Sequence, residues 1–140
     1  MILKLIFILL FIKNVYGDSP HFGEKKIASI LQEHFSESIN QYELLGHNFY
    51  KNENEMIFQI EVLSDITKTN EAIIFSFNTM SVLSNIAKTD FTHSVLILHS
   101  YNSLIPIISR ASLSCSKEYF LYKKQNILQW KKNCLSIQTK

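Results

Sequence analysis

Apolar periodicity is the feature that most narrows the folds open to this chain, because it switches repeatedly between a helical period and a strand period. From Glu24 to Asn40, apolar side chains recur at the spacing of one helix face, and charged residues occupy the other faces. The sequence therefore predicts an amphipathic helix over residues 24–40. Its apolar face holds Ile27, Ile30, Leu31, His34, Phe35 and Ile39.

A strand period follows this helix. Met56, Phe58, Ile60 and Val62 share one parity, and polar residues occur on the other, as is typical of a half-buried strand. A second segment, residues 42–50, precedes it across the polar residues 51–55. The two segments predict a β-hairpin with its tip at 51–55.

The next segment supports two interpretations. A stripe of apolar side chains between Ile73 and Ala87 favours a helix over residues 71–88. The β-branched and aromatic run within it leaves open a strand at 72–77 followed by a shorter helix. We take the helix as the first expectation.

The last third of the chain repeats the hairpin and helix patterns. The apolar run 94–98 predicts a strand buried on both faces. Alternation from Ile105 to Cys115 predicts a returning strand, with Pro106 at its start or at a sheet edge. Ile127, Trp130 and Cys134 have the spacing of a short C-terminal helix.

The order of these elements is helix, two strands, helix, two strands, helix. This order predicts an α+β fold with a small antiparallel sheet of about four strands, arranged as two hairpins, and helices packed on one face. The first helix and the first hairpin have the clearest patterns, so we expect them to form most of the core.

The N-terminal segment has the layout of a secretory signal peptide. Lys4 precedes the apolar run 5–12, and small residues, Val15 and Gly17, stand where a signal peptidase requires them. We expect cleavage before Asp18, which leaves residues 18–140 as one secreted or periplasmic domain without a transmembrane span. The apolar run is shorter than the roughly 20 residues that span a bilayer. A retained membrane anchor and a buried cytosolic element are the alternatives.

Both cysteines, Cys115 and Cys134, lie after the expected cleavage site, and two cysteines allow one intrachain pairing. Because an exported protein meets an oxidising compartment, we expect a Cys115–Cys134 disulfide. Two buried free thiols are the alternative.

Charge is unevenly distributed in the expected mature chain. Residues 18–109 carry 5 lysines and 11 acidic residues, whereas residues 110–140 carry 7 basic residues and one acidic residue. The whole mature chain is neutral, which gives no reason to expect nucleic-acid binding.

The basic C-terminal third is the best candidate for a partner surface. Lysines and aromatic residues alternate there, and such a mixture can bind a protein or an anionic surface. The alternative is that the aromatic residues pack on the sheet while the lysines are solvated. The candidate surface consists of Tyr122, Lys123, Lys124, Lys131 and Lys132, and Lys117 belongs to the same basic stretch.

No catalytic or metal-binding motif stands out. His93 and His99 would share a strand face but lie too far apart to bind one ion, and we expect no metal or cofactor. We expect the carboxylates Glu53 and Glu55, at the hairpin tip, to be solvated charges. The sequence therefore predicts an exported, non-catalytic binding or assembly module, and the alternative is a small secreted hydrolase or inhibitor whose site is not visible in sequence.

Overall fold

The computed structural model describes residues 21–37 and 42–138. The expected signal peptide, residues 1–17, lies outside the described residues, as do positions 38–40 of the first predicted helix. Within the described residues, four α-helices, one short 3-10 helix and five strands follow one another. In chain order they are α2 (Glu24–Ser36), β1 (Glu43–Asn52), β2 (Glu55–Ser64), η1 (Ile66–Lys68), α3 (Thr69–Asn85), β3 (His93–Ser100), β4 (Ser103–Ser112), α4 (Leu113–Phe120), α5 (Ile127–Asn133) and β5 (Leu135–Gln138).

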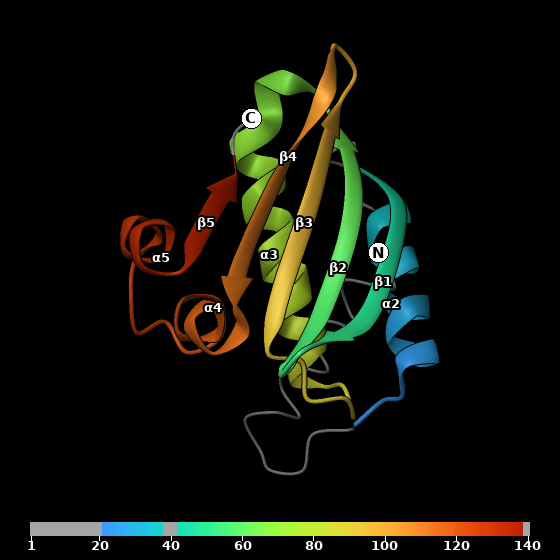
Figure 1. Ribbon diagram of the computed structural model, residues 1–140, viewed down its shortest axis with the longest axis vertical. Coiled ribbons are helices and arrows are strands. Elements are labelled where there is room, and N and C mark those ends of the chain that lie inside the picture. Colours follow the sequence, from blue (N-terminus) through green and yellow to red (C-terminus); the bar gives the residue numbers. More distant parts are fainter. Residues whose placement is uncertain (1–20, 38–41, 139–140) are drawn as a thin grey trace.

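The strands form one sheet in the order β1-β2-β3-β4-β5 (Figure 1). Three of the four neighbouring pairs are antiparallel, and β2 and β3 are parallel. The α+β class is thus confirmed, with five strands where the sequence indicated about four. The parallel pair arises because α3 returns the chain along the length of the sheet, so that β3 starts at the same end as β2.

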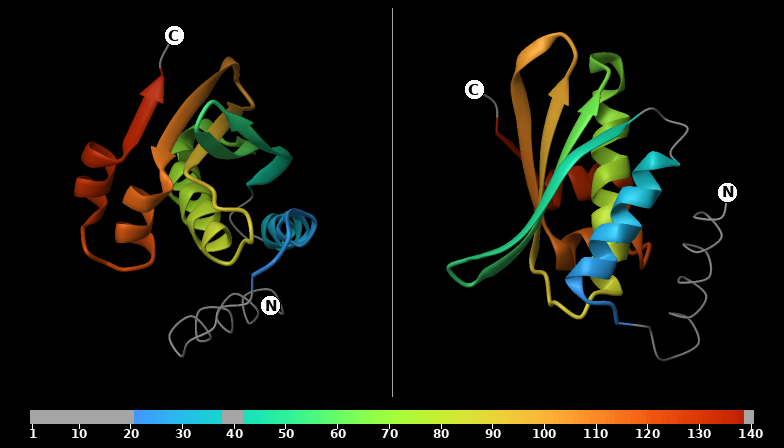
Figure 2. Two further views of the ribbon diagram at one scale, coloured as in Figure 1. Left: turned by 60° about the horizontal axis from the view of Figure 1, so that its bottom comes forward. Right: turned by 90° about the vertical axis from the view of Figure 1, so that its right-hand side faces the viewer.

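Helices α2 and α3 lie against one face of the sheet (Figure 2), and α4 packs against α3. Phe58, Ile60 and Val62 of β2 point into this helical layer and are fully buried. The first predicted hairpin is confirmed, and its turn is formed by only two residues, Glu53 and Asn54.

Helix α3 contributes more buried residues than any other helix of the described chain. It contacts the sheet, α2 and α4, so nearly every side of it is covered. The expectation that the first helix and the first hairpin form most of the core was therefore wrong. The expectation of a helix over most of 71–88 is confirmed. Phe77, Met80 and Leu83 from α3 are fully buried.

Two details of the second hairpin differ from the sequence-based expectation. Strand β3 is buried on one face only, because Val95 and Ile97 point to the sheet face opposite the helices, where they remain partly exposed. Strand β4 ends at Ser112 instead of continuing to Cys115. The Ser112 hydroxyl accepts a hydrogen bond from the Cys115 amide at 3.1 Å and caps α4, so a helix begins where the alternation indicated a strand.

The expected disulfide between Cys115 and Cys134 is present, with 5.6 Å between the two Cα atoms. It joins α4 to the residue that ends α5. The C-terminal helix predicted from Ile127 and Trp130 is confirmed as α5, and Asn126 caps it. Among the described residues, no helix has the length and apolar character needed to cross a membrane.

Candidate functional site

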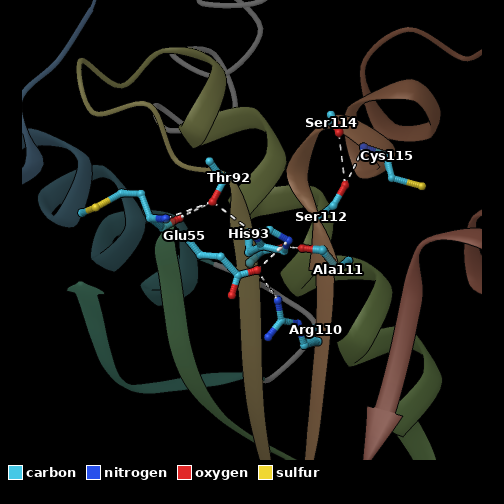
Figure 3. A network of polar contacts seen from close by, with 10 residues as sticks. Glu55, Thr92, His93, Arg110, Ala111, Ser112, Ser114 and Cys115 are labelled. Carbon is cyan, nitrogen blue, oxygen red and sulfur yellow. Dashed lines mark hydrogen bonds and ion pairs between the residues drawn. The ribbon is translucent and has the colours of Figure 1, made fainter. Parts of the chain in front are cut away.

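Three charged or ionisable side chains meet on the open face of the sheet, at the end where β2 and β3 begin (Figure 3). Glu55 Oε2 accepts a hydrogen bond from Arg110 Nη2 at 2.7 Å and lies 3.0 Å from His93 Nε2. Strands β2, β3 and β4 each supply one of the three residues. Glu55 was expected to be a solvated charge at the hairpin tip, and that expectation was wrong because β3 and β4 bring two partners to it.

Thr92 extends this cluster toward the main chain of β2. Its Oγ1 atom accepts a hydrogen bond from the Met56 amide at 2.9 Å and donates to the Met56 carbonyl at 3.3 Å. The same oxygen lies 3.0 Å from His93 Nδ1. A hydroxyl, an imidazole and a carboxylate therefore follow one another in space, which is the order found in hydrolytic triads.

The contacts of this cluster favour a structural role over a reactive triad. The cluster is here called the clamp and is defined as Glu55, Thr92, His93 and Arg110. A nucleophilic hydroxyl must pass its proton to the imidazole, but the Thr92 hydroxyl is already paired with both main-chain groups of Met56. Glu55 is shared with Arg110, so it is not dedicated to orienting His93. The cluster instead ties the starts of β2 and β3 to the end of β4.

A depression of about 540 Å³ opens beside the clamp, between the loop that precedes β3 and the first turns of α4. Two of its lining residues, Phe91 and Leu113, are buried apolar side chains. Most of the other lining residues are polar or charged. The lining residues are Asp90, Phe91, Thr92, His93, Ser112, Leu113, Ser114, Lys117, Glu118, Tyr122 and Lys124.

Lys117 is the most enclosed charge of this depression. Burial lowers the pKa of its ammonium group, and the negative charge of Asp90 opposes part of that effect. Glu118 adds a second carboxylate and Lys124 a second amine, so the depression is of mixed charge. Such a lining can pair with both signs of charge on a ligand.

The structure divides the five residues of the predicted partner surface. Tyr122 and Lys124 line the depression, and Lys124 Nζ lies 5.8 Å from the centre of the Tyr122 ring. Lys123 instead lies over the Tyr119 ring, also at 5.8 Å. Lys123 adopts a φ of 56°, which turns the chain sharply and sends the two neighbouring lysines to different rings.

The other two lysines of the predicted surface lie on α5. Lys131 Nζ donates to Asn70 Oδ1 at 2.5 Å, at the start of α3, and Lys132 is exposed. The two lysine pairs are thus carried by different segments, the α4–α5 loop and α5 itself. Only Lys124 of these four lines the depression.

The aromatic residues of the same stretch mostly serve packing. Trp130 is fully buried, and its ring meets those of Phe77, Tyr119 and Phe120. Tyr122 differs, since 55% of it remains exposed. Aromatic packing thus accounts for Trp130 and Phe120 but not for Tyr122.

The histidines expected to share a strand face do so, and each lies beside a carboxylate. His93 contacts Glu55, and His99 Nε2 lies 3.5 Å from Glu61. No cluster of three or more His, Cys, Asp or Glu side chains arranged for a metal ion occurs within 21–37 and 42–138. Asp90 was missed by the sequence analysis, because a lone acid in a loop has no pattern that links it to Lys117.

The fold and the site together define a small α+β domain with a disulfide-tied helical pair and a charged depression at one end of its sheet. No protein-family model, no curated protein and no solved structure matches this chain.

Proposed function

We propose that the protein is exported and acts as a non-catalytic binding module, whose depression beside α4 receives an acidic segment of a protein partner. The observation that carries this proposal is the position of Lys124 and Tyr122, which are exposed at the rim of a depression that also contains the half-buried Lys117. Lys123 adds a positive charge next to this rim. An acidic side chain that enters would meet amines while its apolar neighbours cover the Tyr122 ring.

Export is supported by the pattern of residues 1–17 and is compatible with the Cys115–Cys134 disulfide. If it is correct, protein recovered from its native location starts at or near Asp18 by mass spectrometry. Recovery of an intact Met1 from the soluble cytoplasm would argue against export.

The alternative function, a small secreted hydrolase, would need Thr92 or His93 as its reacting group. Both are held by contacts within the cluster, and the Thr92 hydroxyl also contacts both main-chain groups of Met56. The contacts therefore favour binding over hydrolysis at this end of the sheet.

Charge reversal of the rim tests the binding proposal. The probe is a fluorescently labelled peptide that alternates glutamate with apolar residues, and its affinity is measured at low and high salt. Lys123→Glu combined with Lys124→Glu is expected to weaken binding by at least about tenfold at low salt, and salt is expected to weaken binding to the parent protein.

Two further variants serve as controls. Lys25→Glu with Lys26→Glu reverses an adjacent pair of exposed lysines on α2 and makes the same change in net charge. Lys131→Glu with Lys132→Glu tests the other pair of the predicted surface. Both are expected to bind the peptide as the parent does. Equal weakening by all three variants would show that net charge alone matters, and the depression would lose its assigned role.

A further inference from the structure

The opposite end of the β3–β4 hairpin carries four exposed apolar side chains, here called the apolar tip and defined as Ile66, Tyr101, Leu104 and Ile105. Leu104 is completely exposed, and the other three are exposed by 53 to 64%. Ile66 comes from η1 and lines the same small hollow as Ile105, so the two segments meet. The hairpin projects past the end of β2 in Figures 1 and 2. Several exposed apolar side chains at one end of a sheet indicate an interaction site, whereas single scattered ones do not.

One serine side chain pairs main-chain groups of the apolar tip. Ser103 Oγ accepts a hydrogen bond from the Ile105 amide at 3.3 Å and donates to the Ile105 carbonyl at 3.1 Å. The next residue, Pro106, has no amide proton. Unpaired main-chain groups are costly in an apolar medium, and these contacts pair both main-chain groups of Ile105.

The same contacts disfavour a protein that would add a strand to this edge. Strand addition requires free amides and carbonyls, and a proline on an edge strand blocks it. A stable protein interface also covers about 800 Å² per partner. Four exposed side chains offer less than that, whereas they suit shallow insertion between lipid headgroups.

Charge indicates which lipid surface fits. Residues 100–109 contain no Lys, Arg, Asp or Glu, and Lys68 and Asp65 on either side of Ile66 have opposite signs. Anionic lipid is therefore not needed for attraction. Tyr101 adds an aromatic ring with a hydroxyl, a side chain that favours the boundary between headgroups and acyl chains. We propose that the apolar tip docks the protein onto the surface of an uncharged, zwitterionic lipid bilayer.

The experiment uses the oxidised chain from residue 18 onward and vesicles of pure phosphatidylcholine, with co-sedimentation as the readout. The parent protein is expected to bind, and high salt is expected to leave its partitioning unchanged. Leu104→Ser with Ile105→Ser is expected to lower the partition coefficient by at least about tenfold, because two apolar side chains no longer enter the lipid. The control is Leu128→Ser on α5, which removes one apolar side chain exposed by 72% and is expected to bind as the parent does.

The folded state is checked by thermal unfolding. Both altered residues of the tip lie in solvent, so a variant with an unchanged melting temperature reports on docking alone. Failure of the parent to bind phosphatidylcholine overturns the proposal, as does binding that appears only when phosphatidylserine is added. A double variant that still binds like the parent also overturns it. If the parent does not bind vesicles and the double variant loses binding to a protein that the parent binds, the lipid proposal is overturned and the tip is reassigned to a protein partner. None of these outcomes depends on the depression beside α4.

Discussion

The indole Nε1 atom of Trp130 donates a hydrogen bond to Ser116 Oγ at 3.1 Å, and both side chains are fully buried. The contact joins α5 to α4. The Trp130 ring also meets the rings of Phe77 and Phe120, with centroids 5.5 and 4.9 Å away. Trp130 is the buried residue of α5 and, with the nearby disulfide, is a main point of attachment of this helix.

Two substitutions of Trp130 are therefore expected to lower the free energy of unfolding, each through the loss of a different contact. Trp130→Ala leaves a large cavity and is expected to lower the free energy of unfolding by about 3–5 kcal/mol. Trp130→Phe keeps an aromatic ring but leaves the Ser116 hydroxyl without its partner, which is expected to cost about 1–3 kcal/mol. Urea denaturation measures both losses. Adding Ser116→Ala to Trp130→Phe is expected to recover part of the second loss. No recovery would mean that the hydrogen bond contributes little and that ring volume accounts for the effect.

The sequence predicted those elements whose patterns are local. The hairpin around Glu53, most of α3 and the disulfide all follow from periodicity or from counting cysteines. Helix α4 was hidden because Ala111, Leu113 and Cys115 continue the strand alternation, while the small buried Ser116 weakens the helical stripe. Helix capping by Ser112 decides between the two, and apolar periodicity does not report it.

Other features depend on contacts between distant parts of the chain. Strand β5 has four residues, and only one of them is partly buried. Its own sequence therefore shows no strand pattern, and it is a strand because it pairs with β4. The depression brings Asp90 together with Lys117 and Lys124, which no spacing rule relates. The Glu55–Arg110 contact likewise joins residues 55 positions apart. Such sites become visible only after the strand order is known.

The depression and the apolar tip lie at opposite ends of one hairpin. Strand β3 has eight residues, which at about 3.3 Å per residue separates the two ends by roughly 25 Å. If both proposals hold, a protein docked through Leu104 and Ile105 presents the rim at Lys124 away from the bilayer. Partner binding and lipid binding would then be independent, and neither set of variants would affect the other measurement.

The disulfide is expected to contribute to stability by tying α4 to α5. Replacing both Cys115 and Cys134 with serine opens a loop of about 20 residues and is expected to lower the free energy of unfolding by up to about 3 kcal/mol. The loss is smaller if the hydrogen bond from Gln125 Nε2 to the Cys115 carbonyl, at 3.0 Å, keeps the loop in place. Urea denaturation with and without reductant measures it.

Reductant supplies the control for this prediction. It is expected to bring the parent protein to the stability of the double-serine variant and to leave that variant unchanged. Two alkylatable thiols in protein isolated without reductant would contradict the assigned bond.

Tyr42 predicts how stability changes at alkaline pH. Its side chain is buried beside Phe75, with ring centroids 5.1 Å apart. Burial raises the pKa of the Tyr42 phenol above its ordinary value of 10.0, and the charge and hydrogen bond of Glu71 raise it further. The folded state therefore holds the phenol proton more tightly than the unfolded state does. The stabilisation is complete below the unfolded pKa of about 10 and is lost as pH rises through the higher folded value.

Tyr42→Phe removes the ionisable group and tests this relation. At neutral pH the variant is expected to lose about 1 kcal/mol, because the hydrogen bond with Glu71 is gone. Between about pH 9 and pH 11 its free energy of unfolding should fall less steeply than that of the parent, so the two curves approach each other. Urea denaturation at a series of pH values gives both curves. Tyr101→Phe, at an exposed position, controls for the removal of a phenol as such. Parallel curves for Tyr42→Phe and the parent would show that this proton is held no more tightly in the folded state than in the unfolded chain.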